Sequence, residues 1–442
     1  MNAYFAAHAL LPEGWASDVR IDVDDAGNIA AVKPKASSAK AQTLAGPVLP
    51  GMANLHSHAF QRAMAGLTEV RATAQDDFWS WRELMYRFME RLTPDQAQAI
   101  AIQLYIEMLK HGYTAVAEFH YVHHPAEMLH RHLEAAHASG VAITLLPSLY
   151  RWSGFSRKPL EPRQKRFESD PKSIIAALES LTPSLTEDVR AGLAPHSLRA
   201  VDPVSLEELL DAVDPKLPIH IHVAEQTREV EECERALGKR PVEWLLENHE
   251  VDAHWCLVHA THMNAAETQW LAQSGAIVGL CPTTEGNLGD GIFPLVDYRS
   301  ARGRYGIGGD SHVSRDPAEE LKLLEYVQRL VARKRNLNVG AASQAVGTTL
   351  WLEAAAGGGQ ALGRNMGALA AGKRADLVVL DGEAPDLAGR SGDAIANAVL
   401  FSGASFVRDV MVGGRWVVRE GSHALEEEAA AAYKRAVSEL LA

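Results

Sequence analysis

The sequence has few cysteines and no long apolar run, and each absence excludes a class of protein. Its 442 residues include three cysteines at irregular spacing, Cys233, Cys256 and Cys281. These do not suit a disulfide framework or a thiolate metal site, and they are typical of reduced thiols in a cytoplasmic protein. No stretch of about 18 apolar residues is present, so we expect no membrane-spanning helix. The opening MNAYFAAHALLPEGW lacks the basic and apolar regions of a signal peptide.

Dense basic stretches are also missing. The chain has 43 Lys and Arg against 56 Asp and Glu, which gives a formal net charge of −13. A chain this acidic repels phosphate backbones, so we expect no nucleic-acid partner. The hydrophobic fraction is 47% and the charged fraction 22%, which is ordinary for a globular protein and ample for a large core.

From Pro47 onward, apolar runs of strand length alternate with longer amphipathic stretches, a pattern typical of parallel βα units. The strand candidates are VLPGMANLHSH, YTAVAEFHY, VAITLLPSLY, VRAGLAPHS, LPIHIHVAE, WCLVHATH, GAIVGLCPTT and RYGIGGDSH. Eight such strands predict an α/β fold of the TIM-like (β/α)8 barrel type, with the active site at the carboxyl ends of the strands. An open doubly wound sheet would need a glycine-rich phosphate turn after its first strand, and LPGMANLHSH has none.

Both ends of the chain contain short strand-like segments. VRIDVD and NIAAVKP lie near the start, and ADLVVLD, FVRDVMVGG and RWVVREG follow the predicted barrel. We therefore expect one small β-sandwich domain built from both chain ends, with domain boundaries at 1–48, 49–365 and 366–442. The last part also contains a predicted amphipathic helix, HALEEEAAAAYKRAVSELLA.

Polar side chains gather where the predicted strands end. They are His56, His58, His120, His196, His220, His222, Glu225, His259 and Asp310. Residues i and i+2 of a strand share a face, so His56 and His58 can direct two imidazoles at one point. The pair His130 and His132 falls in a helical pattern, where i and i+2 do not share a face, and we expect both at the surface.

A metal ion at this point needs ligands from elsewhere in the chain. His222 is the best third ligand and Asp310 the best fourth, since each stands where a buried strand meets a loop. The alternative for Asp310 is a helix N-cap. Water would fill the open coordination position, and a bound divalent ion would lower the pKa of that water towards about 7.

Proton transfer needs an acid or base beside the ion that is not itself a ligand. Glu225 follows His222 by three residues and suits this task, although on its own it would be read as a solvated acid at a helix start. His259, at the end of the next strand, could orient the nucleophile or stabilise the developing oxyanion.

His56-x-His58 after LPGMAN, His222-x-x-Glu225, His259 and Asp310 together resemble the amidohydrolase superfamily, as does the late GALAAGKRADLVVLD. The resemblance implies that Glu225 protonates the leaving nitrogen, His259 polarises the water, and Asp310 is both ligand and proton acceptor. Binuclear members bridge two ions through a lysine or glutamate at the end of strand four. Here that strand reads VRAGLAPHS, and no lysine lies between Lys172 and Lys216. One divalent ion is therefore expected, with Zn²⁺ as first choice and Fe²⁺ as second.

Several local sequence segments most resemble the branch of that superfamily that hydrolyses N-formimino-L-glutamate to N-formyl-L-glutamate and ammonia. The segments are NLHSHAFQRAMAGLTE, FWSWRELMYRF, EFHYVHH and APHSLRAV. A dicarboxylate substrate needs planar cationic donors, and the resemblance implies Arg82 and Arg199 as its anchors, with Gln61, Tyr121 and His196 as hydrogen-bonding contacts. The alternatives are a helix-surface arginine for Arg82, a packed aromatic for Tyr121 and a helix-cap contact for Gln61.

Two rival functions remain open from the sequence. An aminohydrolase of a nucleobase or another heteroaromatic amine would need an apolar, aromatic-walled slot and would have no use for two arginines. A noncatalytic barrel would be expected to have lost ligands, and all of the predicted ones are present. Homodimers are common among such enzymes, but no pattern in the chain bears on oligomeric state.

Overall fold

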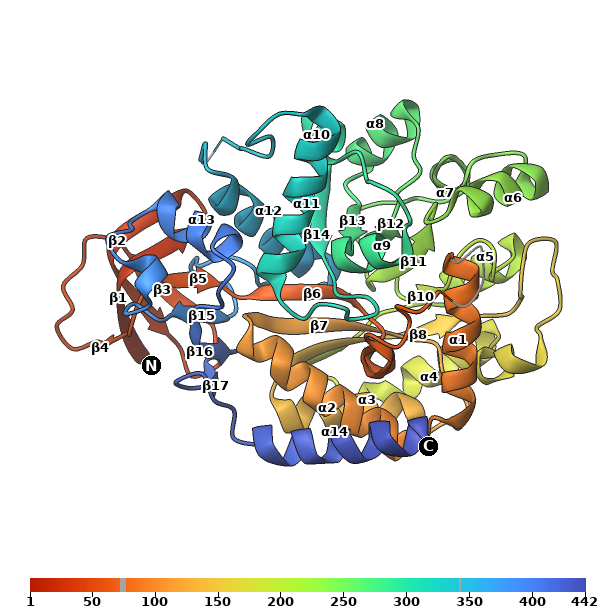
Figure 1. Ribbon diagram of the computed structural model, residues 1–442, viewed down its shortest axis with the longest axis horizontal. Helices are drawn as coiled ribbons and strands as arrows, with labels where there is room; N and C mark the ends of the chain where they lie inside the picture. Colours follow the sequence, from red (N-terminus) through yellow and green to blue (C-terminus); the bar gives the residue numbers. More distant parts are fainter. Residues whose placement is uncertain (72–76, 342) are drawn as a thin grey trace.

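The computed structural model describes residues 1–71, 77–341 and 343–442, and its centre is a ring of parallel strands (Figure 1). Within the described residues the ring has eight strand positions. They are β6 (Met52–Ser57), β7 (Tyr113–His120), β8 (Ala142–Leu149), β9 (Val189–Ala191) with β10 (Ala194–Pro195), β11 (Ile219–Val223), β12 (Trp255–His259), β13 (Ile277–Leu280) and β14 (Arg304–Ile307). Each coincides with one of the predicted strands.

The ring consists of two hydrogen-bonded arcs that are joined by isolated bridges. One arc runs from β6 to β10 and the other from β11 to β14. Parallel bridges between Leu193 and Ile219 and between Ser197 and His222 connect the arcs on one side, and a bridge between Ser57 and Asp310 connects them on the other. The predicted (β/α)8 barrel is therefore confirmed.

Helices cover the outside of the ring, as the amphipathic stretches predict. Those up to the last strand are α1 (Phe78–Arg91), α2 (Pro94–Lys110), α3 (Met128–Ser139), α4 (Pro171–Leu181), α5 (Pro203–Asp211), α6 (Thr227–Leu237), α7 (Pro241–Asn248), α8 (Ala265–Ser274), α9 (Pro282–Leu288) and α10 (Leu295–Ser300). They are followed by α11 (Pro317–Ala332), α12 (Val346–Ala361), α13 (Asp393–Phe401) and α14 (Glu426–Leu441). The chain also has short 3-10 helices, which are η1 (Ala59–Met64), η2 (Pro162–Phe167), η3 (Thr182–Ser184) and η4 (Pro385–Leu387). None of the described helices combines the length and apolarity needed to cross a bilayer.

Helix α2 shows how local sequence sets an element. Thr93 and Gln96 form a reciprocal capping box, and Pro94 occupies the first turn, where no backbone donor is needed. The buried face carries Ile100 and Leu104, one turn apart, so burial of this stripe against the barrel stabilises the helix.

The surface prediction for His132 is wrong. His132 is 4% exposed, its Nδ1 lies 3.3 Å from the Tyr105 hydroxyl, and its ring packs at 5.1 Å from that of His120. Burial lowers its pKa to about 4. The i, i+2 rule correctly separated it from His130, but it could not tell which face of α3 meets the barrel.

A second sheet takes strands from both ends of the chain, as predicted. Its strands are β1 (Asn2–Leu11), β2 (Gly14–Val23), β3 (Ile29–Lys33), β4 (Gln42–Thr43), β5 (Val48–Pro50), β15 (Leu377–Leu380), β16 (Val407–Val412) and β17 (Arg415–Val418). The order is β17-β16-β15-β5-β1-β2-β3. Tyr4 of β1 and Trp416 of β17 are well separated in this order, yet their rings lie 5.5 Å apart, so the sheet curls over its own core. The domain boundaries stay a prediction.

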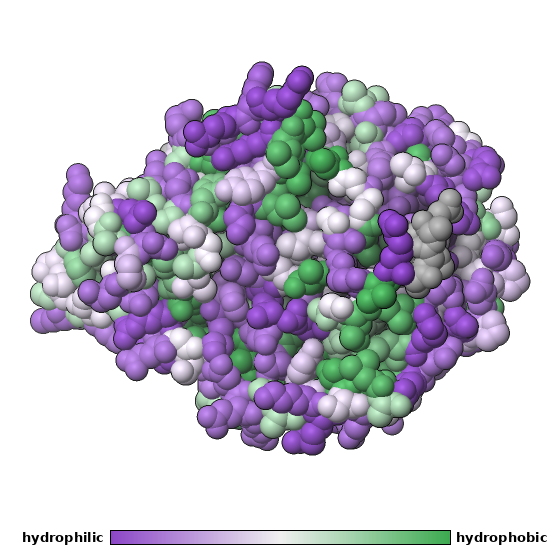
Figure 2. Space-filling view, viewed as in Figure 1, coloured by the Kyte–Doolittle hydropathy of each residue, from purple (hydrophilic) through white to green (hydrophobic). Residues whose placement is uncertain are grey.

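The carboxyl-terminal helix lies away from this small sheet. In Figure 1, α14 runs along α2 at the edge of the barrel. Lys110 of α2 forms an ion pair with Glu426, and Gln96 Nε2 donates to Glu439 at 3.0 Å. The face shown in Figure 2 is mostly hydrophilic, with apolar side chains in separate patches.

Candidate active site

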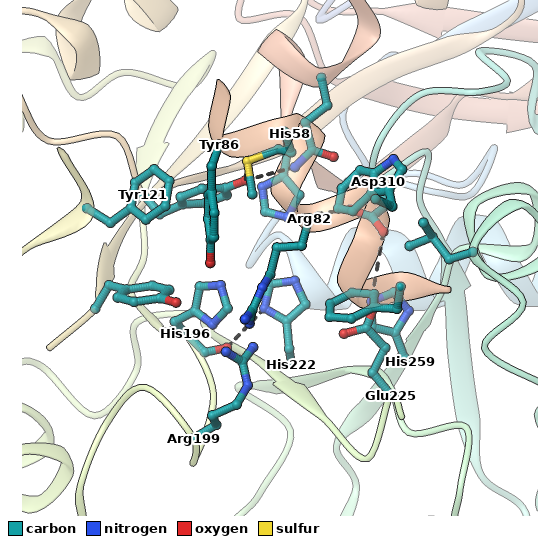
Figure 3. A pocket seen from close by; sticks show the side chains of 17 residues that line it. His58, Arg82, Tyr86, Tyr121, His196, Arg199, His222, Glu225, His259 and Asp310 are labelled. Atoms are coloured by element: carbon teal, nitrogen blue, oxygen red, sulfur yellow. Dashed lines mark hydrogen bonds and ion pairs between the residues drawn. The ribbon is translucent and has the colours of Figure 1, made fainter. Parts of the chain in front are cut away.

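A cavity opens at the carboxyl ends of the barrel strands, where enzymes of this architecture place their active sites. Its walls include all of the predicted substrate contacts and most of the predicted metal and catalytic residues (Figure 3). They are His58, Gln61, Arg82, Tyr121, His196, Arg199, His222, Glu225, His259 and Asp310.

Imidazole nitrogens from two strand ends converge with a carboxylate at the floor of the cavity. His222 Nε2 lies 3.0 Å from His56 Nε2. Asp310 Oδ1 lies 3.5 Å from His56 Nε2 and 3.4 Å from His58 Nε2. These side chains are buried, and their ligand atoms lie within 4.8 Å of one another in overlapping groups. The tertiary structure therefore brings together the four predicted ligands.

Hydrogen bonds orient two of these rings. His58 Nδ1 lies 2.9 Å from the Phe119 carbonyl, and His222 Nδ1 lies 2.9 Å from the His196 carbonyl. Because a carbonyl can only accept, each Nδ1 carries the proton, and in the neutral ring the Nε2 lone pair faces the cluster. Burial lowers the pKa of both imidazoles, and neighbouring histidines lower that of His222 further. Neutral imidazoles that are held in place by backbone carbonyls and lie beside a carboxylate form a set of ligands that fits a divalent ion.

The backbone around the cluster adopts unusual conformations. His259 has a φ of 66° and Asp310 a φ of 49°, in the left-handed region that non-glycine residues seldom adopt. At Gly308, a Cβ atom would lie 2.8 Å from the His56 backbone nitrogen. Only glycine lets the end of β14 approach β6 this closely, which places Asp310 beside His56.

Glu225 and His259 form a second group beside Asp310 (Figure 3). His259 Nε2 lies 3.8 Å from both Glu225 Oε1 and Asp310 Oδ2. Burial raises the pKa of Glu225 to about 7, and Asp310 adds to the effect. Glu225 is 8% exposed, so it is not a solvated acid, and the N-cap of the helix after Asp310 is Asp316.

Glu285 is a partner of His259 that the sequence analysis missed. Its Oε1 lies 3.2 Å from His259 Nδ1 and accepts the Cys281 backbone N–H at 2.8 Å. Burial opposes protonation of His259, but Glu225, Glu285 and Asp310 outweigh it and raise its pKa to about 10. Glu285 stands shortly after a predicted strand, so the strand-end rule that found the other acids could have found it.

A second missed group lies behind the cluster. Glu118 of β7 accepts from the Ser57 hydroxyl at 2.6 Å, the Ala59 backbone N–H at 2.9 Å and the Tyr105 hydroxyl at 3.1 Å. Ser57 stands between the two ligand histidines, and its Oγ also lies 2.8 Å from His312 Nε2. Burial raises the pKa of Glu118 to about 7. An acid inside an otherwise apolar strand was the available signal.

Arg82 and Arg199 enter the same cavity, and their guanidinium groups point toward one another in Figure 3. Arg82 Nε and Nη1 and Arg199 Nη1 are buried without a hydrogen-bond acceptor among the described residues. Burial and the neighbouring Arg199 lower the pKa of Arg82. Because unpaired buried cations are costly, the pair is arranged for an anion that the described residues do not supply.

The remaining predicted contacts form the cavity wall. Gln61 Nε2 donates to the Tyr121 hydroxyl at 2.8 Å, so Gln61 meets Tyr121 and does not cap a helix, while Tyr121 is both packed and hydrogen-bonded. His196 Nδ1 lies 3.2 Å from Ser197 Oγ. Aromatic residues complete the wall: Phe78, Trp81, Tyr86, Tyr150 and Phe167.

Comparison with known proteins agrees with this geometry. The model of the amidohydrolase family matches residues 48–417, and that of the formimidoylglutamate deiminase amino-terminal domain matches residues 1–44. The chain is 53% identical over its whole length, and that of the relative, to a formimidoylglutamate deiminase of Pseudomonas aeruginosa. A 5-methylthioadenosine/S-adenosylhomocysteine deaminase of Natronomonas pharaonis is 28% identical, over 84% of this chain and 81% of its own.

A crystal structure of an amidohydrolase from Brucella melitensis superposes with a TM-score of 0.94 at 43% identity and covers all of both chains. Barrel topology, strand-end histidines and full-length similarity agree with one another. The chain therefore belongs to the amidohydrolase family and has the amino-terminal domain found in its formimidoylglutamate deiminases.

Proposed function

We propose that this protein hydrolyses N-formimino-L-glutamate to N-formyl-L-glutamate and ammonia. One observation carries the proposal: a single cavity holds a cluster of histidines and carboxylates at one side and two arginines at another, whose buried donor atoms find no acceptor among the described residues. The substrate has a formimino carbon for hydrolysis and two carboxylates to be held. The full-length similarity to the Pseudomonas deiminase supports the same reaction.

One divalent ion would be held by His56, His58, His222 and Asp310. We infer that it is zinc, with ferrous iron as the second choice, because nitrogen and oxygen ligands suit both. Such an ion acts as a Lewis acid and makes water nucleophilic near neutral pH. Two features of the chain support this donor set: the short approach of His56 Nε2 to His222 Nε2, and the carbonyl partners that turn the Nε2 atoms inward.

Glu225 and Asp310 transfer protons during the reaction, and His259 assists the attack of water. The water oxygen adds to the formimino carbon, and Asp310 takes the proton that the water loses. His259, whose Nδ1 is held by Glu285, directs its Nε2 at the attacking oxygen and stabilises its charge. Glu225 gives a proton to the terminal nitrogen, and a pKa of about 7 suits an acid that works at neutral pH. Asp310 then passes its proton to the same nitrogen, the carbon–nitrogen bond breaks and ammonia leaves. The hydroxyl proton of the intermediate returns to Glu225 as the oxygen becomes the formyl carbonyl.

Arg82 and Arg199 would hold the two carboxylates of the glutamate part. Planar guanidinium forks bind carboxylates with two parallel hydrogen bonds, and three of their buried donor atoms have no acceptor within the described chain. Gln61, Tyr121 and His196, which line the same cavity, would contact the substrate through hydrogen bonds.

The aromatic wall also fits the rival reaction, deamination of a nucleobase or related ring, which the two arginines do not serve. Ammonia release by metal-analysed protein from N-formimino-L-glutamate, guanine and cytosine separates the two. We expect turnover of the first substrate alone. Equal or faster release from a nucleobase would replace the proposed function with its rival.

A further inference from the structure

Trp79 lies on α1, one turn before Arg82. We propose that Trp79 is a positioning residue that presents the Arg82 guanidinium to a substrate carboxylate and so sets the preference for dicarboxylates. This inference rests on the proposed function, since it concerns how the substrate's anionic part is held.

Two guanidinium groups lie against the Trp79 indole. The Arg82 Cζ is 4.6 Å from the ring centroid, and the Arg228 Cζ is 4.4 Å from it. Both distances are well inside the range of cation–π attraction, which is strongest for tryptophan. The Arg82 group also lies 5.5 Å from the Tyr86 ring.

An aromatic partner leaves the arginine available to a ligand, which an acidic partner would not. A carboxylate would occupy the guanidinium N–H groups and cancel the charge that the substrate must meet. The indole face attracts the cation without accepting those N–H groups. Arg82 Nε and Nη1 are in fact buried and without acceptors in the described part of the chain, so the side chain is held but not neutralised.

The same indole connects two elements of the active site. Arg228 is near the start of α6, three residues after Glu225, and its Nε is held 2.8 Å from Glu232 Oε1. Trp79 therefore ties α1, which carries Arg82, to the segment that follows the proposed acid. A shift of α1 away from α6 would move Arg82 relative to Glu225, so Trp79 fixes the distance between the charge-binding and reacting ends of the site.

Trp79 acts through Arg82 and does not touch the substrate. Arg82 is among the residues that line the active-site cavity, whereas Trp79 is not. Trp79 instead lines an outer cavity, together with Arg82, Arg199 and Arg228. Loss of the indole should therefore weaken substrate binding and leave the proton transfers at Glu225 and Asp310 intact.

A double-mutant cycle tests this role. In Trp79→Leu we expect KM for N-formimino-L-glutamate to rise about 5-fold or more, with kcat within about twofold of the parent and unchanged metal content. The KM of Trp79→Phe, whose ring attracts a cation more weakly than tryptophan does, should lie between those of the parent and Trp79→Leu. In an Arg82→Ala background, Trp79→Leu should add no further rise, because the residue through which it acts is gone. Trp270→Leu, at an exposed tryptophan of α8, is the matched control and should change neither constant.

Binding of glutarate, measured by calorimetry on the metal-loaded protein, separates this inference from the proposed function. We expect glutarate to bind the parent and to bind Arg82→Ala and Trp79→Leu more weakly, whether or not formiminoglutamate is turned over. If glutarate affinity depends on Arg82 but not on Trp79, the inference is overturned while the proposed function stands. The same follows if Trp79→Leu raises KM equally in the presence and absence of Arg82. Absence of ammonia release from N-formimino-L-glutamate by the parent overturns the proposed function.

Discussion

The Nε2 atoms of His56 and His222 lie 3.0 Å apart, although the two residues come from strands that are far apart in the sequence. His222 Nδ1 faces a carbonyl, so its Nε2 is an acceptor in the neutral ring. A proton or a cation must therefore lie between the two nitrogens. With Asp310 and His58 beside them, a divalent ion satisfies all four groups at once.

Removal of the ion should therefore abolish ammonia release. We expect treatment with a strong chelator to give inactive protein, and added Zn²⁺ to restore activity in proportion to the metal bound. Bound ligand stabilises the folded state, so the chelated protein should also melt at a lower temperature. Full activity in a sample that elemental analysis finds free of metal contradicts the proposed centre.

Glu225→Gln should keep the metal and lose about 10²-fold or more in kcat, the scale of general acid–base catalysis. The amide preserves the size of the side chain but cannot deliver the proton to the leaving nitrogen. Glu231→Gln, at an exposed acid on the neighbouring helix, is the control and should behave like the parent. If the Glu225→Gln variant turns over nearly as fast as the parent, Glu225 has no part in the mechanism.

Arg199→Ala should raise KM for N-formimino-L-glutamate by about 10-fold or more, because a hydrogen-bonded charge partner is lost, and should leave metal content unchanged. A monocarboxylate analogue offers a second comparison. If the parent and the Arg199→Ala variant process that analogue equally poorly, Arg199 meets the missing carboxylate. If the variant handles the dicarboxylate as well as the parent does, Arg199 is not an anchor.

Glu118→Ala should weaken metal binding by about 10-fold or more, as loss of an outer hydrogen-bond partner does at metal sites. The substitution removes the carboxylate that accepts from the Ser57 hydroxyl and the Ala59 N–H, so the end of β6 that carries His56 and His58 loosens. Competition with a coloured chelator measures the metal affinity independently of activity. Unchanged affinity in a folded Glu118→Ala variant would mean that Glu118 supports only the core.

Ionised Asp202 should stabilise the folded protein above about pH 4 and lose this effect at lower pH. Burial opposes ionisation of Asp202, but hydrogen bonds from Ser205, Trp152 and Arg157 outweigh it and lower its pKa to about 2, from 3.8. A carboxyl group with a lowered folded-state pKa stabilises the fold above its unfolded pKa, and this contribution is lost as the pH falls through the folded one.

Asp202→Asn should therefore lower the melting temperature at pH 7 and by a similar amount at pH 5, with the gap to the parent narrowing only from about pH 4 downward. Thermal unfolding of both proteins across this range is the measurement. A gap that is constant down to about pH 2, or that opens instead of closing, contradicts the assigned ionisation.

Periodicity and local spacing were sufficient to predict the eight barrel strands, the strand-end polar residues and the shared sheet of the two chain ends, because strand alternation and turn residues act over a few neighbours. His56 and His58 are a case of this kind, since two residues apart in a strand means one face. The helix containing His132 was recognised for the same reason.

Which side of an element is buried, and which distant groups meet, was decided only by packing. His132 is buried because α3 turns that face toward Tyr105 and His120. Glu285 meets His259, and Trp79 meets both Arg82 and Arg228, through contacts that no local spacing encodes. Electrostatic effects depend on distance and burial in space. The raised pKa of Glu225 and the lack of acceptors for the arginine donors among the described residues therefore belong to the tertiary structure.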